Sequence, residues 1–229
     1  DIEKGVAKSN IPVLYKKNTT NDLFVLTYVI EKGKNEDRNL STAVQYLDYL
    51  GTSTLSPVQV KQQFYELACN FSVKPTSERT YITISGLAEN MGKAMDLVES
   101  LLADAQANPQ VLEFLKADLL KIREDKKLNQ QANFAMLLQY GLYGPKSPVT
   151  NVLSKEELMG LKSEILLACL SGLNTIEHSV MYYGPATQES LIENVNKYHR
   201  VPATLTKVDK KNKFTFQETP QNRVIIAPY

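Results

Sequence analysis

Apolar, β-branched segments that occur in neighbouring pairs, with helical patterns between them, most constrain how this chain can fold. The first pair is PVLYKKN (12–18) and LFVLTYVI (23–30), which predict two strands joined by a hairpin-like connection. The second pair, CNFSVK (69–74) and TYITISGL (80–87), flanks the turn PTSER and predicts a β-hairpin. Three later segments also have strand character: HSVMYYG (178–184), KFTFQ (213–217) and VIIAPY (224–229).

Helical patterns fill the intervals between the strand pairs. A helix cap at Ser56-Pro57 and a capping box over Ser154–Glu157 mark two helix starts. The other helical patterns cover 43–52, 89–107, 109 to about 140, 161–173 and 187–198. Short connections between paired strands imply antiparallel pairing, and helices segregated from the hairpins imply an α+β fold with helices on one face of the sheet. We expect one domain over residues 1–229.

The helical segment AVQYLDYLGT (43–52) has two faces of interest. One is an apolar stripe at the i, i+3, i+4, i+7 spacing, made by Ala43, Tyr46, Leu47 and Leu50. The other carries Gln45, Asp48 and Tyr49 at the spacing at which an H-x-x-E-H helix presents two zinc-binding imidazoles and a general-base carboxylate. The spacing of a zinc-peptidase helix is thus present without its ligands.

The composition excludes several functional classes. The chain has 229 residues, 43% of them hydrophobic, and a net charge of +1, so nothing suggests a nucleic-acid partner. The basic stretch KVDKKNK (207–213) is expected to be a solvated loop. Cys69 and Cys169 have no metal-binding spacing and are expected to be buried thiols and not a disulfide. No apolar run approaches the roughly 18 residues of a membrane span, and no signal peptide is present.

Taken together, the order of these elements resembles the insulinase/pitrilysin family of zinc metallopeptidases. TAVQYLDYLGT (42–52) resembles the zinc helix of that family, VKPTSERTYITISG (73–86) its central hairpin, and GLAENMGKAMDLVESLLAD (86–104) the strand-to-helix step that follows. SKEEL (154–158) and HSVMYYGP (178–185) also fit in order. The resemblance implies a metallohydrolase-like two-layer sandwich, and a longer parent chain built from repeated domains that close around an unfolded peptide.

The resemblance also implies that this domain is not catalytic. Gln45, Asp48 and Tyr49 fall on the positions of the two histidines and the glutamate, and the distal glutamate would fall on 119–123, which holds no carboxylate. Asp118 and Glu124 would serve only after a register shift. The three degenerate positions either form a hydrogen-bonded polar remnant, which we favour, or face the chamber. We therefore expect no metal in this domain and zinc in the catalytic domain of the parent chain.

Two further sets of residues bear on function. Non-catalytic domains of the family often supply an arginine and a tyrosine that hold substrate, and here these positions become Phe64 and Phe71. This places the chain closest to the third of four repeats. His178 and His199, the two histidines of the chain, have no ligand spacing and are expected to be structural or surface residues.

We therefore expect a non-catalytic domain that lines the chamber and helps to bind extended peptide for a sister domain, partly by β-strand addition. The alternative is a free-standing non-catalytic subunit that pairs with an active peptidase. An active peptidase in its own right is disfavoured by the missing ligands. We expect no nucleic-acid or membrane partner, and an isolated fragment can self-associate through the surface that a sister domain covers. The compartment is not predicted, since a signal for export can lie upstream of this fragment.

Overall fold

The computed structural model describes residues 2–210 and 214–227. Its centre is a six-stranded sheet in the order β1-β2-β6-β3-β5-β4. The strands are β1 (Glu3–Ala7), β2 (Ile11–Lys17), β3 (Leu23–Ile30), β4 (Cys69–Pro75), β5 (Thr80–Leu87) and β6 (His178–Gly184). All neighbours pair antiparallel except β2 and β6, which are parallel. The fold is therefore α+β with a mostly antiparallel sheet, as the sequence predicts.

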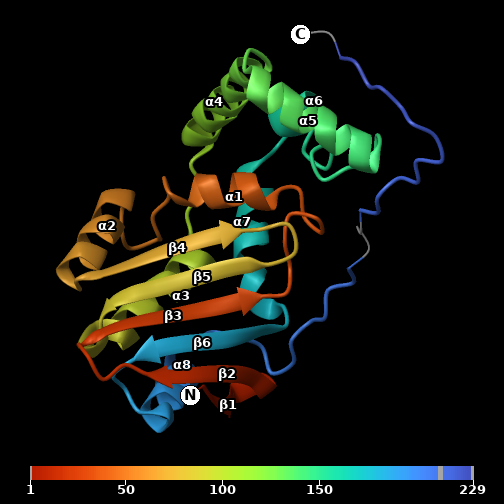
Figure 1. The fold of residues 1–229 in the computed structure, drawn as a ribbon. Coiled ribbons are helices and arrows are strands. Elements are labelled where there is room, and N and C mark those ends of the chain that lie inside the picture. The colour runs from red at the N-terminus through yellow and green to blue at the C-terminus, as the bar shows by residue number, and fades with distance from the viewer. Residues whose placement is uncertain (1, 211–213, 228–229) are drawn as a thin grey trace.

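The described residues also contain three short 3-10 helices and eight α-helices: α1 (Leu40–Leu47), α2 (Pro57–Glu66), α3 (Met91–Asp104), α4 (Pro109–Lys127), α5 (Gln130–Tyr143), α6 (Lys155–Met159), α7 (Ser163–Ser171) and α8 (Gln188–Tyr198). Helices α3, α7 and α8 lie behind the sheet in the view of Figure 1. Helices α1 and α2 lie beside the β4 edge, and α4 and α5 project from the body (Figure 1). None of the described helices has the length and apolar character that crossing a bilayer requires.

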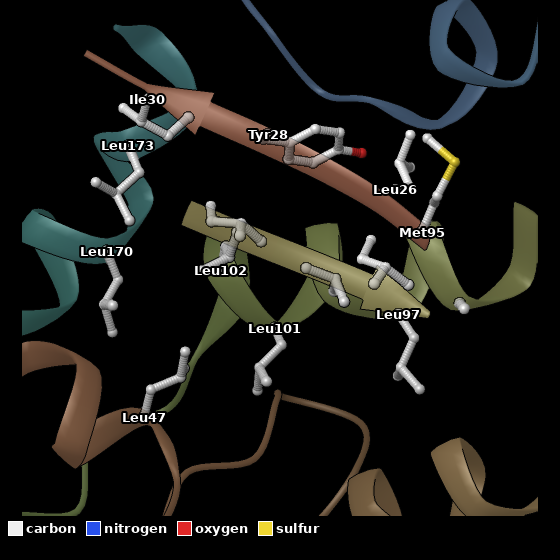
Figure 2. Packing of buried hydrophobic residues seen from close by; sticks show 14 of the residues in the cluster. Leu26, Tyr28, Ile30, Leu47, Met95, Leu97, Leu101, Leu102, Leu170 and Leu173 are labelled. Atoms are coloured by element: carbon white, nitrogen blue, oxygen red, sulfur yellow. The ribbon is translucent and has the colours of Figure 1, made fainter. Parts of the chain in front are cut away.

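The core lies between the sheet and this helical layer. Alternate residues of β3, namely Phe24, Leu26, Tyr28 and Ile30, are fully buried, because successive side chains of a strand point to opposite faces. Figure 2 shows Ile30 beside Leu173, which follows α7, and Leu26 beside Met95 of α3. Helix α3 contributes the broadest apolar face: Met91, Ala94, Met95, Val98, Leu101 and Leu102. Truncating any one of its buried leucines would cost about 2–5 kcal/mol of folding free energy.

The predicted helix starts and the second hairpin are confirmed. Ser56 accepts from the backbone N–H of Gln59 in a capping box with proline at the first helical position, and Ser154 and Glu157 form a second capping box. Strands β4 and β5 form the expected antiparallel hairpin. The helical pattern from 109 to about 140 divides into α4 and α5, because Asn129 caps a new helix by accepting from the N–H of Ala132.

The first predicted hairpin is wrong. Strands β2 and β3 exist close to their predicted bounds, but β6 lies between them and pairs with both. The partner that β2 does have on its other side is β1, a short strand that the sequence patterns did not reveal. Of the predicted late strands, residues 214–217 and 224–227 form no strand, and 213, 228 and 229 lie outside the described residues. The two cysteines are buried and free, as expected.

Candidate functional site

Helix α1 buries its predicted stripe but ends earlier than the sequence suggests. The buried stripe is Ala43, Tyr46, Leu47 and Leu50. The helix ends at Leu47, and the N–H of Tyr49 donates to the carbonyl of Tyr46 at 3.0 Å, so the last turn tightens. The chain then turns back so tightly that a Cβ built on Gly51 would lie 2.1 Å from the carbonyl oxygen of Leu55. This turn is where the glycine is required.

Gln45, Asp48 and Tyr49, the predicted counterparts of the zinc-helix ligands, lie on the surface. The Nε2 of Gln45 donates to the carbonyl of Ser41, one turn earlier in the same helix, at 3.2 Å. Asp48 is exposed, and Tyr49 is 51% exposed. No hydrogen bond among the described residues joins Gln45, Asp48 and Tyr49 to one another. Gln45 is therefore hydrogen-bonded within its own helix, while the exposed ring of Tyr49 is available to contact a ligand.

These residues do not fit a zinc ion. Zinc in peptidases is held by imidazole nitrogens and carboxylates, and α1 offers an amide already committed to its own helix, one carboxylate and one phenol. Within the described residues, no group of three His, Cys, Asp or Glu side chains is arranged to hold a metal. On α4, Asp118 is exposed and Glu124 pairs with Lys127 at 2.8 Å. The α1 region therefore has no set of zinc ligands.

A groove of about 520 Å³ lies where α1 and α2 meet the β4 edge. We call it the α1–β4 groove. Its lining residues are Val44, Leu47, Asp48, Lys61, Phe64, Tyr65, Asn70, Phe71, Ser72, Val73 and Lys74. The rings of Phe64 and Phe71 contact each other with centroids 4.8 Å apart. Phe64 and Phe71, the positions at which the resemblance predicts a lost arginine and tyrosine, therefore form part of the apolar wall of this groove.

The charged groups of the groove are two lysines and one aspartate. Partial burial raises the pKa of Asp48, and the charge of Lys61 acts in the opposite direction. With Lys61 and Lys74 in the lining against Asp48, the groove carries a small excess of positive charge. Its surface thus combines apolar walls with a cationic rim.

Strand β4 is an edge strand, and the register identifies its free backbone groups. The N–H of Thr76 donates to Arg79 and the N–H of Leu87 donates to Ala68, so the even-numbered β4 residues exchange hydrogen bonds with β5. The odd-numbered residues Phe71 and Val73 consequently direct their N–H and C=O groups away from β5. Because both residues also line the α1–β4 groove, an unpaired row of backbone donors and acceptors runs beside its apolar walls.

A second polar cluster lies in the core and joins residues distant in sequence. The Nε2 atoms of His178 and His199 are 2.7 Å apart, and the Nδ1 of His199 lies 2.5 Å from Oε1 of Glu99 on α3. The other carboxylate oxygen of Glu99 accepts from Asn174 and from the backbone N–H of Arg200. All three titratable groups are buried. The two histidines, whose spacing in the sequence does not indicate a shared site, are thus in direct contact.

The proton positions in this cluster follow from its geometry. The Nδ1 of His178 lies 2.6 Å from the carbonyl oxygen of Ile176, which can only accept, so Nδ1 carries a proton. Neutral His178 then accepts at Nε2, and His199 must donate from its own Nε2. Burial is the main reason that the pKa of His178 falls from 6.5 to about 4. This chain of bonds links α3, β6 and the segment after α8, and it has no opening for a metal because the two Nε2 atoms share a hydrogen bond.

The position of Glu99 in the sequence is itself a signal of a buried polar site. Glu99 follows Met95 by four positions and precedes Leu102 by three, so it lies on the apolar stripe of α3. A carboxylate on an apolar stripe needs a buried partner. No local pattern points to His199, because that partner is 100 positions away.

The fold resembles known peptidase structures. No family model and no curated protein matches the sequence. A peptidase M16 inactive domain from Pseudomonas fluorescens superimposes with a TM-score of 0.73 and 15% identity, covering 91% of this chain and 53% of that one. The periplasmic protease PqqL from Escherichia coli gives 0.77 and 13%, covering 98% and 25%. A mutant ferredoxin protease FusC, in complex with Arabidopsis ferredoxin, gives 0.75 and 14%, covering 94% and 24%.

At these identities the comparison establishes the fold. The chain spans about half the length of the first of these proteins and about a quarter of the other two. The chain therefore has the fold seen in a peptidase M16 inactive domain and in parts of the proteases PqqL and FusC, which agrees with the fold that the sequence resemblance implies.

Proposed function

We propose that this chain is a non-catalytic domain of a longer zinc peptidase, and that it binds extended peptide along β4 for cleavage by a sister domain. The observation that supports this proposal is the edge of β4. The backbone groups of Phe71 and Val73 are directed outward beside the α1–β4 groove. An added strand would gain backbone hydrogen bonds there whatever its sequence, as expected of a domain that helps to degrade unfolded peptides.

Side chains of the groove would add a moderate preference. In an extended peptide, alternate side chains point to the same side, so every second residue would lie on the wall formed by Phe64, Phe71 and Val73. The excess of lysine in the lining favours peptides with an acidic residue near this wall. Zinc and the catalytic groups would belong to the sister domain, and this domain alone would not hydrolyse peptides.

Replacing Val73 by proline tests the proposal. Proline removes the outward N–H of residue 73, and it is tolerated at an edge position whose N–H does not bond within the sheet. The matched control is Val73→Ala, which shortens the side chain and keeps the N–H. Binding of a fluorescein-labelled extended peptide, with alternating apolar and acidic residues, would be measured by anisotropy.

We expect Val73→Pro to bind the peptide at least about fivefold more weakly than Val73→Ala, because one backbone hydrogen bond contributes about 1 kcal/mol. Circular dichroism would establish that both variants are folded. Equal affinity of the two folded variants would show that the peptide does not pair with β4. A wild-type chain that binds no peptide would refute peptide binding by this domain altogether.

A further inference from the structure

One face of the sheet is not covered by helices, and we call it the open face. In Figure 1 it is turned toward the viewer, with α3, α7 and α8 behind the sheet. Because successive strand residues alternate between the two faces, the open face carries Leu14 of β2, Val25 of β3, and Met181 and Tyr183 of β6. Although these strands are central in the sheet, Val25, Met181 and Tyr183 are 42%, 45% and 42% exposed. Large apolar side chains that are exposed together in this way are typical of a binding surface.

A hollow of about 450 Å³ lies in the open face over β2, β6 and β3, and we call it the β6 hollow. Its lining is mostly apolar, and Lys16 is the one charged side chain among the described residues that line it. All three strands pair with neighbours on both sides, so the hollow offers no free backbone groups to an added strand. A ligand there would be recognised by its side chains, above all by an apolar group that fills the hollow. The residues of the open face that line it are Leu14, Lys16, Val25, Thr27, Met181 and Tyr183.

The charged strand residues of the open face all have the same sign. They are Lys4, Lys16 and Lys74, and no aspartate or glutamate of the six strands is on this face. All three lysines are exposed, and none of them forms a salt bridge within the described residues. Glu31 and Glu177 lie beyond the strand ends, and Glu31 is already in a salt bridge. An occupant that carries carboxylates is therefore favoured on the open face.

The open face continues into the proposed peptide site. Asn70, Ser72 and Lys74 of β4 belong to the open face and also line the α1–β4 groove. Strands β5 and β3 separate β4 from β6, so about 14 Å of sheet lie between these two strands at about 4.8 Å per strand. About five residues of extended peptide span this distance, because each residue adds about 3.3 Å. One peptide can therefore pair with β4 and also reach the β6 hollow.

We propose that the β6 hollow is a second subsite for the peptide that pairs with β4, and that it takes an apolar or aromatic side chain next to a carboxylate. The apolar side chain would lie against Val25 and Met181, and the carboxylate would pair with Lys16. This inference rests on the proposed function and specifies its substrates as peptides that carry such an anchor about five residues from the segment on β4. The anchor contact selects among peptides, whereas backbone pairing with β4 accepts any sequence.

Two fluorescein-labelled peptides test the subsite. Both contain the alternating apolar and acidic segment proposed for β4, a spacer of five glycine and serine residues, and a two-residue anchor. The anchor is phenylalanine followed by aspartate in one peptide, and serine followed by aspartate in the other. Each peptide is made with the anchor at either end, because a strand can be added to an edge in both directions. Dissociation constants for the 229-residue chain would be measured by anisotropy.

Substitutions in the chain locate the contact. Met181→Gln removes apolar lining and keeps the length of the side chain. Lys16→Glu reverses the charge beside the hollow, and its matched control is Lys17→Glu, the next residue of β2, whose side chain is on the opposite face of the sheet. Circular dichroism would establish that the variants are folded. In the wild type, NMR of the 13C-labelled methyl group of Met181 would report contact with the anchor directly.

We expect the phenylalanine peptide to bind the wild type at least about fivefold more tightly than the serine peptide, and to shift the Met181 methyl resonance, because the hollow buries the ring. Met181→Gln should reduce this ratio to less than about twofold. Lys16→Glu should weaken binding of the phenylalanine peptide by about threefold or more relative to Lys17→Glu, because Lys16 lines the hollow and Lys17 does not.

Equal affinities of the two peptides for the wild type would overturn the subsite, and so would an advantage of phenylalanine that persists in folded Met181→Gln. In both cases, weaker binding of the serine peptide by Val73→Pro than by Val73→Ala would leave pairing with β4 intact. A wild type that binds neither peptide would refute the proposed function together with the subsite. Binding to vesicles of equal parts phosphatidylglycerol and phosphatidylcholine that Lys16→Glu abolishes, without a peptide-induced shift of Met181, would assign the open face to an anionic membrane and overturn the subsite.

Discussion

The buried His178–His199–Glu99 cluster makes the stability of this domain depend on pH in a specific way. In the native state His178 is neutral, because it is buried and its Nε2 must accept from His199. Its pKa is lowered from 6.5 to about 4. Between these two values the unfolded chain binds a proton that the native chain does not, so the free energy of unfolding decreases as pH falls from 6.5 and the loss is complete below about 4.

The magnitude follows from the width of that interval. About 2.5 pH units separate 6.5 from about 4, and each unit corresponds to about 1.4 kcal/mol, so the loss attributable to His178 is about 3 kcal/mol. The groups that face His178 are His199, Glu99, the ring of Tyr28 and the carbonyl of Ile176. Since the chain has two histidines, no third imidazole contributes.

Urea unfolding followed by circular dichroism from pH 4 to 7.5 would measure this effect in the wild type and in His178→Gln. The glutamine carbonyl can accept from His199 but does not titrate. We expect the variant to be less stable at pH 7 by about 1–3 kcal/mol, because a buried hydrogen-bonded ring is replaced. Its dependence on pH between 4 and 6.5 should be shallower by about 1.4 kcal/mol per pH unit.

The control is Glu124→Gln, at an exposed ion pair on α4, which should leave the slope in this interval nearly unchanged. An equally steep slope in His178→Gln would refute the assignment of a neutral, buried His178. Stability that increases in the wild type as pH falls from 6.5 to 4 would contradict the sign of the effect.

The two neighbouring tyrosines of the α1 region should differ sharply. Tyr46 is fully buried and its hydroxyl oxygen accepts from the N–H of Asn108, so Tyr46→Ala should cost about 3–5 kcal/mol of folding free energy. Tyr49→Ala should change the folding free energy by less than about 0.5 kcal/mol, because the ring of Tyr49 is half exposed. Chemical unfolding would measure both losses, and similar losses would contradict this placement of the two rings. The triple variant Gln45→His, Asp48→Glu, Tyr49→His should not become a peptidase, because α4 offers no distal carboxylate to the site; chelator-sensitive cleavage of a fluorogenic peptide by this variant would disprove that conclusion.

Local sequence signals predicted several elements because their causes are local. The capping boxes at Ser56 and Ser154 form within four residues, and the β4–β5 hairpin closes over a short turn. The stripe of α1 was predictable because helical periodicity alone decides which residues share a face. The mismatch between Gln45, Asp48, Tyr49 and a zinc-binding set was equally visible, since it depends only on residue identity and spacing.

Tertiary structure decided whatever depends on contacts between distant parts of the chain. The insertion of β6 between β2 and β3 pairs residues 148 to 167 positions apart, and no periodicity within any of these strands encodes it. The contact of His178 and His199 with Glu99 arises because β6, α3 and the segment after α8 converge in the core. The free edge of β4 is decided in the same way. A strand lies at an edge when it pairs with another strand on one side only. Only the complete order of the sheet therefore shows that Phe71 and Val73 have backbone groups left to pair.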